Sequence, residues 1–250
     1  FLYYDKSVLT EEDVQTLDGI LAAANAAGKQ VQMDISNGWY LASFFLGNGC
    51  TLGLDEDGRQ VCDFNSPAGL AAAEAVRAFC NDPAFTPGDD SFLMGAIGDS
   101  VCAGVSGTWC AEAISEKLGE NYGACKLPTF TVDGEQVQMG SFLGCKILGV
   151  NTQTAHPVEA MMLAEYLTSE EAQVRRFEVR GYGPSNIAAA SSEAVAADPA
   201  LSALAAQSAY AISQQVLAGF WTPAEALGAE FEAHSTADLL DQFVAQATEG

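Results

Sequence analysis

The sequence predicts an α/β fold, with a mainly parallel sheet that helices cover on both faces. Signals for helix starts recur along the chain, and short apolar or β-branched runs lie between them. Strands that alternate with helices need crossover connections, and these give parallel neighbours in a sheet. A composition that is 49% hydrophobic and 9% aromatic supplies enough apolar residues for a packed core.

The predicted strands are short, nearly continuous apolar runs, as is typical of strands that are buried on both faces. They lie at residues 31–35, 101–105, 123–127 and 147–150. We also expect one hairpin between Cys50 and Cys62, because the DEDG at 55–58 supplies a turn between two short runs.

The predicted helices begin at two kinds of signal. In the first kind, a capping residue precedes a proline whose fixed φ suits the first helical position. These starts are Ser66-Pro67, Asp198-Pro199 and Thr222-Pro223. In the second kind, an acidic residue stands three positions after the capping residue. These starts are Thr222 to Glu225, Thr168 to Glu171 and Ser235 to Asp238. After Ser235, apolar residues recur at helical spacing and predict a helix that packs on a core. They are Leu239, Leu240, Phe243, Val244 and Ala247.

The charge balance excludes several classes of protein. The chain has 10 Lys and Arg against 33 Asp and Glu, a formal net charge of −23. A general nucleic-acid-binding protein is excluded, because phosphate contacts need clustered cations. Attachment to an anionic membrane through basic residues is disfavoured for the same reason. No window approaches the roughly 18 apolar residues of a membrane helix, and the first ten residues lack a signal-peptide pattern. We therefore expect the chain to carry no anchor or signal of its own.

Cysteine and histidine spacing argues against a metal site. The seven cysteines contain no C-x-x-C pair, and His156 and His234 stand alone, so the spacing of a zinc site is missing. The DEDG at 55–58 lacks the spaced carboxylates of a calcium loop, and Phe64 stands where that loop has glutamate. We expect neither a metal nor a cofactor.

No catalytic motif is complete. The GVSG at 104–107 does not form a G-x-S-x-G nucleophile elbow, and a Ser or Cys nucleophile would have only two histidines as a base. A carboxylate pair in a cleft arises by chance among 33 acidic residues, so a glycosidase stays open as an alternative that no motif supports. The sequence favours a binding protein without catalytic residues.

Several motifs occur in one order along the chain. They are LYYDKSVL at 2–9, the segment from Phe92 to Trp109, GCKILGVN at 144–151, HPVEA at 156–160, YLTSEEAQ at 166–173 and GYGPS at 181–185. This order resembles the carbohydrate-binding subunits of ABC importers, the extracellular solute-binding proteins related to maltodextrin-binding protein. The resemblance implies a type II periplasmic-binding-protein-like fold, in which a ligand lies in a cleft between two α/β lobes.

The resemblance also implies how the chain is divided. Residues 1–9 form a crossover strand, and residues 10–145 form the ligand-binding lobe two. Residues 146–190 contain a second crossover and a remnant of lobe one, and residues 191–250 return to lobe two as C-terminal helices. Most of the first lobe is expected to be missing. We therefore expect Met161, Leu163 and Leu167 to expose apolar faces, and a homodimer through 146–190 is one way to cover them.

The ligand site is expected beyond the carboxyl ends of the strands, where open α/β sheets bind ligands. Asn37, Trp39 and Tyr40 follow one predicted strand, Trp109 follows another, and Trp221 precedes a helix. Aromatic rings suit the apolar C–H faces of sugars. The resemblance carries the family's aromatic ligand contacts onto Trp39 or Tyr40, Trp109 and Trp221. Each tryptophan could instead be a half-buried core residue, and Asn37 could cap a helix, which its residue type favours, or bind a hydroxyl.

The implied function is saccharide binding and delivery to ABC permease subunits, without catalysis. The implied location is extracytoplasmic, on the cell surface or in the periplasm, with a lipid anchor on the full-length protein. A saccharide-sensing or adhesive module stays open as an alternative, because nothing in a binding lobe distinguishes it.

An extracytoplasmic location permits a Cys50–Cys62 disulfide. A three-residue loop centred on Glu56 would place these cysteines opposite each other, whereas a four-residue loop would point them to opposite faces. The alternative is a pair of small buried hydrophobic residues.

Overall fold

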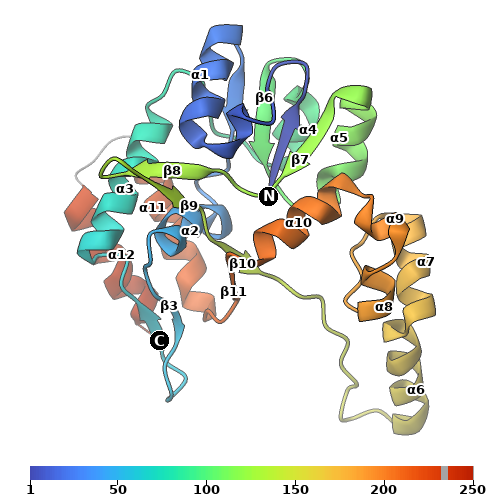
Figure 1. The fold of residues 1–250 in the computed structure, drawn as a ribbon. Helices are drawn as coiled ribbons and strands as arrows, with labels where there is room; N and C mark the ends of the chain where they lie inside the picture. The colour runs from blue at the N-terminus through green and yellow to red at the C-terminus, as the bar shows by residue number, and fades with distance from the viewer. Residues whose placement is uncertain (232–235, 250) are drawn as a thin grey trace.

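A five-stranded sheet forms the centre of the chain in the computed structural model, which describes residues 1–231 and 236–249 (Figure 1). The strands are β1 (Leu2–Asp5), β2 (Gln30–Gln32), β5 (Phe85–Thr86), β6 (Val101–Val105) and β7 (Tyr122–Cys125). Their order is β5-β2-β6-β1-β7. Strand β2 runs parallel to β5 and β6, whereas β1 is antiparallel to both of its neighbours. The predicted α/β class is confirmed, and the sheet is mixed, with two parallel and two antiparallel pairings among the described residues.

Helices cover both faces of this sheet. They are α1 (Leu17–Ala27), α2 (Gly38–Gly47), α3 (Pro67–Cys80), α4 (Asp90–Ala96), α5 (Ala111–Leu118) and α10 (Pro199–Ser208). Helices α11 (Trp221–Glu230) and α12 (Thr236–Thr248) pack further out, against α2 and α3. Short 3-10 turns lie at Asp13–Gln15, Thr108–Cys110, Gly119–Asn121 and Ala218–Phe220. Side chains of β1 alternate between the two cores: Leu2 and Tyr4 pack with residues of α1 to α3, and Tyr3 packs with residues of α4, α5 and α10. The sheet is therefore buried on both faces.

Two predicted helix starts are confirmed and two begin elsewhere. Ser66 and Asp198 cap α3 and α10 by accepting hydrogen bonds from backbone N–H groups three residues on. The start predicted at Thr222 lies too late in the chain. The 3-10 turn Ala218–Phe220 runs directly into α11, which begins at Trp221 and has no side-chain cap. Helix α7 (Glu170–Arg180) is capped by Ser169. Thr168 is instead the last residue of α6 (Pro157–Thr168), where its hydroxyl donates hydrogen bonds to carbonyl groups of that helix.

The predicted C-terminal helix is present as α12. It buries Leu240, Phe243 and Ala247, three members of the apolar stripe. Its expected cap, Ser235, lies outside the described residues.

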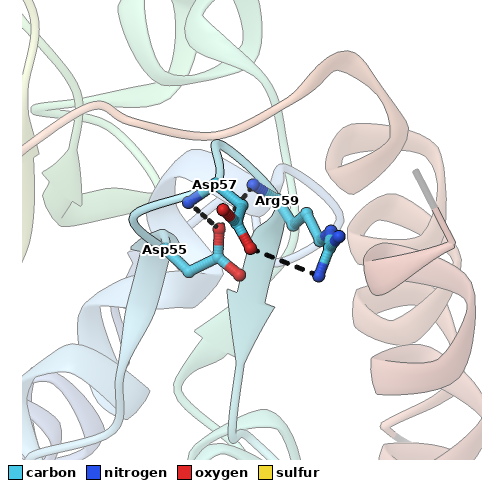
Figure 2. A network of polar contacts seen from close by, with 3 residues as sticks. All are labelled: Asp55, Asp57 and Arg59. Carbon is cyan, nitrogen blue, oxygen red and sulfur yellow. Dashed lines mark hydrogen bonds and ion pairs between the residues drawn. The ribbon is translucent and has the colours of Figure 1, made fainter.

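The predicted hairpin is formed by β3 (Leu52–Leu54) and β4 (Gln60–Cys62). Figure 2 shows its turn, in which the Asp55 Oδ1 accepts hydrogen bonds from the backbone N–H groups of Asp57, at 2.9 Å, and Arg59, at 2.8 Å. Gly58 has a φ of +76°, a conformation that glycine adopts without steric cost. Arg59 Nη1 lies 3.5 Å from Asp57 Oδ2. These carboxylates therefore organise a turn, and no cluster suited to a metal ion occurs among the described residues.

The register of this hairpin differs from the one that the disulfide expectation needed. Cys62 lies opposite Leu52, because the loop holds five residues centred on Asp57 and not three centred on Glu56. Cys50 lies two residues before the partner of Cys62, and both cysteines are free thiols in the structure. Burial raises the pKa of the Cys50 thiol to about 11 and that of Cys62 to about 12.

Four further strands lie outside the central sheet. Strands β8 (Thr129–Val132) and β9 (Glu135–Gln138) form a hairpin, and β10 (Ser141–Leu143) pairs in parallel with β11 (Ala211–Ser213). The prediction of a strand at 147–150 is wrong. These residues have no strand partner in the described chain, and Ile147 is 91% exposed, so the apolar run has neither a ladder nor a core to stabilise it.

Four helices stand apart from the sheet, after an extended segment (Figure 1). They are α6 (Pro157–Thr168), α7, α8 (Ile187–Ala190) and α9 (Glu193–Ala196). Helix α6 buries none of its residues, and Met161 and Leu163 are exposed while Leu167 is half-buried. The chain returns to the sheet at α10, which packs against β7. None of the described helices combines the length and the apolar character that crossing a membrane requires.

Candidate functional site

Three parallel strands end at one edge of the sheet, and polar and aromatic residues follow each of them. Asp34 and the residues up to Tyr40 follow β2, Asp90 follows β5, and Ser106 and Trp109 follow β6. Ligands of open α/β sheets bind beyond the carboxyl ends of the strands. The sheet topology therefore brings together two of the three segments that the sequence singled out, and adds the segment that contains Asp90.

Asn37 caps helix α2. Its Oδ1 accepts a hydrogen bond from the backbone N–H of Trp39 at 3.0 Å, so the capping role that its residue type favours is the one the structure shows. The side chain is exposed, and its Nδ2 has no acceptor among the described residues. The amide nitrogen can therefore donate to a ligand while the oxygen holds the helix.

Trp39 and Trp221 belong to one aromatic cluster. Their ring centroids lie 6.4 Å apart with an interplanar angle of 15°, and Phe142 lies 5.1 Å from Trp39. Both tryptophans are half-buried. A Cβ at Gly38 would lie 2.7 Å from the Cβ of Ala224, so glycine at this position lets α2 and α11 approach closely enough for the two rings to meet.

A hollow opens beside this cluster. Its volume is about 270 Å³, and its lining consists of two carboxylates, one tryptophan and the start of α2. The lining residues are Asp34, Ser36, Asn37, Gly38, Trp221 and Glu225. The hollow therefore combines carboxylate acceptors, an amide donor and an aromatic ring, which is the mixture of groups that polyhydroxylated ligands need.

Tyr40 points into the interior behind the site. Its side chain is 9% exposed, so it offers little open ring face for a ligand. Burial raises the pKa of the Tyr40 phenol well above its ordinary value, and the nearby Asp90 carboxylate adds to this rise, against a hydrogen bond with Ser106 that lowers it. The phenol is therefore protonated across the physiological range and contributes to the polar floor between β2 and β6.

Trp109 is the most exposed aromatic residue of the site, at 57%. Its Nε1 donates a hydrogen bond to Asp90 Oδ2 at 2.6 Å. A Cβ at Gly107 would lie 2.2 Å from the indole ring, so the ring rests against the bare α-carbon of that glycine. The indole is held at one face and one edge, and this leaves the rest of it open.

The structure brings Trp39 and Trp221 together directly, whereas Trp109 is linked to them through polar residues. Tyr40 interacts with Asp90 and Ser106 on the side of Trp109, and with Asp34 on the side of the hollow.

Sequence reasoning missed several residues of this site. They are Asp34, Phe142, Glu225 and the pair Asp90 and Ser106. A positional signal existed for three of these residues. Ser106 directly follows one predicted strand, Asp34 lies in the last two residues of another, and Glu225 lies one helical turn after Trp221.

Comparison with known proteins gives a family match and several structural matches. The family described as bacterial extracellular solute-binding protein matches residues 1–203. This range includes Trp39 and Trp109 but ends before Trp221. No curated protein matches the sequence at a significant level.

The structural matches cover the whole chain. A solved structure with acarbose has a TM-score of 0.88 and 31% sequence identity, over 100% of this chain and 68% of that chain. The maltodextrin-binding protein MalE1 from L. casei BL23, without ligand, has a TM-score of 0.87 and 26% identity, over 100% of this chain and 69% of that one. The maltose-maltodextrin-binding protein of Alicyclobacillus acidocaldarius, at 22% identity, has a TM-score of 0.82 over 99% of this chain and 69% of that one. The fold is that of the type II periplasmic-binding-protein-like proteins.

Proposed function

This chain belongs to the bacterial extracellular solute-binding proteins, and we propose that it binds a saccharide at the carboxyl ends of β2, β5 and β6, without catalysis or cofactor. The observation that carries the proposal is the open Trp109 ring on the same sheet edge as the hollow beside Trp221. The similar structure with acarbose and the similarity to MalE1 support a sugar-like ligand.

Recognition would combine ring faces with polar groups. The open face of Trp109 suits the apolar C–H face of a sugar ring. Asp34 and Glu225 can accept hydrogen bonds from hydroxyl groups, and the Asn37 Nδ2 can donate one. Trp39 would act mainly by holding Trp221 in place, because Phe142 already packs against its ring.

The membership of an extracellular family supports an extracytoplasmic location for the proposed activity. We infer that the bound saccharide is passed to ABC permease subunits, and that the full-length protein is anchored by lipid. In such a system, ligand binding favours one conformational state through its higher affinity for that state, and the permease recognises that state.

The segment 146–190, which includes α6, α7 and α8, is proposed to form a self-association surface. Residues 146–190 contain four Lys and Arg against five Asp and Glu, a net charge of −1, so the rest of the chain carries the remaining −22. Two copies would therefore repel each other least through this part. Its exposed apolar residues include Met161, Met162 and Leu163. Light scattering should show a dimer that Met161→Glu dissociates, and a monomeric wild type over the micromolar range would refute the dimer.

Calorimetric titration with maltotetraose, maltotriose and acarbose tests the proposed function. Trp109→Ala should weaken binding roughly 5- to 30-fold, since an aromatic contact contributes on the order of 1–2 kcal/mol. Tyr166→Ala is the matched control, because Tyr166 is 55% exposed and lies on α6, away from the sheet. Wild-type affinity in the control together with the weakened affinity in Trp109→Ala supports the site. Absence of binding by the wild type to every saccharide would refute the function.

A further inference from the structure

We propose that Asp90 is a ligand-binding residue of this site, which holds the Trp109 ring in place and also accepts hydrogen bonds from saccharide hydroxyls beside that ring. This inference rests on the proposed function and deepens it. It concerns a residue that no sequence motif marked, at the start of the helix that follows β5.

Asp90 joins segments that are distant in the sequence. Its Oδ2 accepts the indole hydrogen bond of Trp109 at 2.6 Å, and its Oδ1 accepts one from Ser106 Oγ at 2.6 Å. Asp90 follows β5, whereas Ser106 and Trp109 follow β6, and β2 lies between these two strands in the sheet. The carboxylate therefore reaches across the carboxyl end of β2, at the centre of the site.

The surroundings fix the position of this carboxylate. Ser106 is buried, and its Oγ also lies 3.2 Å from Cys110 Sγ. On the other side, Tyr40 is close enough for the charge of Asp90 to raise the pKa of its phenol, although burial is the larger cause. Asp90 itself is only half-buried, so one side of the carboxylate remains accessible.

The bonding capacity of the carboxylate leaves room for a ligand. An ionised carboxylate has about four acceptor positions, and Ser106 and Trp109 occupy two of them. Because the indole N–H already donates its hydrogen bond to Asp90, Trp109 can contact a ligand only through its ring. A sugar stacked on that ring would place hydroxyls at the ring edge, where Asp90 accepts them as charge-assisted hydrogen bonds.

The binding test uses the whole chain and maltotetraose. Asp90→Asn keeps the size of the side chain and removes its charge. Asp89→Asn is the matched control, because it makes the same charge change at the neighbouring residue and Asn still caps α4. We expect Asp90→Asn to raise Kd roughly 10-fold or more, and Asp89→Asn to change it less than about 2-fold. Equal Kd values for the wild type and Asp90→Asn would overturn the proposal.

A second test separates direct contact from ring positioning. In the Trp109→Phe background, the ring no longer bonds to Asp90, so a further loss of affinity on Asp90→Asn would support direct contact. No further loss would overturn direct contact.

A third measurement needs no ligand. The indole N–H resonance of Trp109 should move in Asp90→Ala and exchange faster with solvent, while those of Trp39 and Trp221 stay unchanged. An unchanged Trp109 resonance would overturn the positioning role. If the wild type binds no saccharide but this resonance responds as expected, the proposed function and the direct contact fail together, and ring positioning stands.

Discussion

Gly107→Ala should weaken saccharide binding without unfolding the protein. The new Cβ would lie 2.2 Å from two atoms of the Trp109 indole and 2.7 Å from a third, far inside van der Waals contact. The backbone of Gly107 is extended, with a φ of −114°, and alanine accepts this conformation without strain. The exposed indole therefore moves away and the backbone stays.

The displaced ring loses two interactions. The Nε1 to Asp90 hydrogen bond involves a charged acceptor, and such bonds contribute about 1.5–3 kcal/mol when buried and less at a half-exposed site. Stacking against the ligand contributes on the order of 1–2 kcal/mol. The hydrogen bond is lost in the free and the bound protein alike, so it is mainly the stacking contribution that enters Kd, which should rise roughly 5- to 30-fold and no further than in Trp109→Ala.

Calorimetric titration with maltotetraose measures the affinity, and urea unfolding measures the stability. Gly95→Ala is the control, because a Cβ there meets nothing within 4 Å and Gly95 lies within helix α4. The control should keep wild-type affinity and gain about 0.5–1 kcal/mol of stability. Wild-type affinity in Gly107→Ala, with the Trp109 fluorescence unchanged, would refute the reasoning.

Three further predictions concern the fold. Ser66→Ala removes the oxygen that accepts the Gly69 N–H, so the free energy of unfolding should fall by about 1 kcal/mol in urea, and Ser66→Asn should restore most of it. Gly58→Ala places a Cβ at a φ of +76° and should cost about 1 kcal/mol, whereas Gly58→Asn should cost less; equal losses would contradict the conformational argument. Burial raises the pKa of the Cys62 thiol to about 12, above its unfolded value near 9, so its contribution to stability is present below pH 9 and is lost as pH rises toward 12. Cys62→Ala should therefore flatten the fall in stability over that window, and an unchanged pH profile would contradict it.

The parts of the fold that depend on local chemistry could be predicted from the sequence. Ser66 and Asp198 cap helices because their oxygens reach N–H groups three residues away, and the run at 101–105 is a strand with the predicted bounds. The run at 147–150 has the same apolar character but has no partner strand among residues 1–231 and 236–249, and a sequence pattern does not contain that information. Long-range pairing decided between these two outcomes.

The candidate site also has a part that the sequence predicts and a part that depends on long-range strand order. A tryptophan after a strand end is visible in the sequence, and Trp109 lies where that rule predicts. The partnership of Asp90 with Trp109 depends on β5 and β6 flanking β2, an order that no local signal sets. The three-residue loop expected between Cys50 and Cys62 is wrong for a related reason, because the backbone hydrogen bonds that Asp55 accepts from Asp57 and Arg59 stabilise a five-residue loop.

The tryptophans of the site differ in what holds them, and this predicts different consequences of their removal. Trp39 and Trp221 pack on each other and on Phe142, so replacing Trp39 by Ala removes core contacts and should cost about 2–4 kcal/mol of stability. Trp109 touches the core little, because its ring is 57% exposed, so Trp109→Ala should change stability by less than about 1 kcal/mol. A loss of stability in Trp109→Ala as large as that in Trp39→Ala would mean that Trp109 is a structural residue and not an open binding surface.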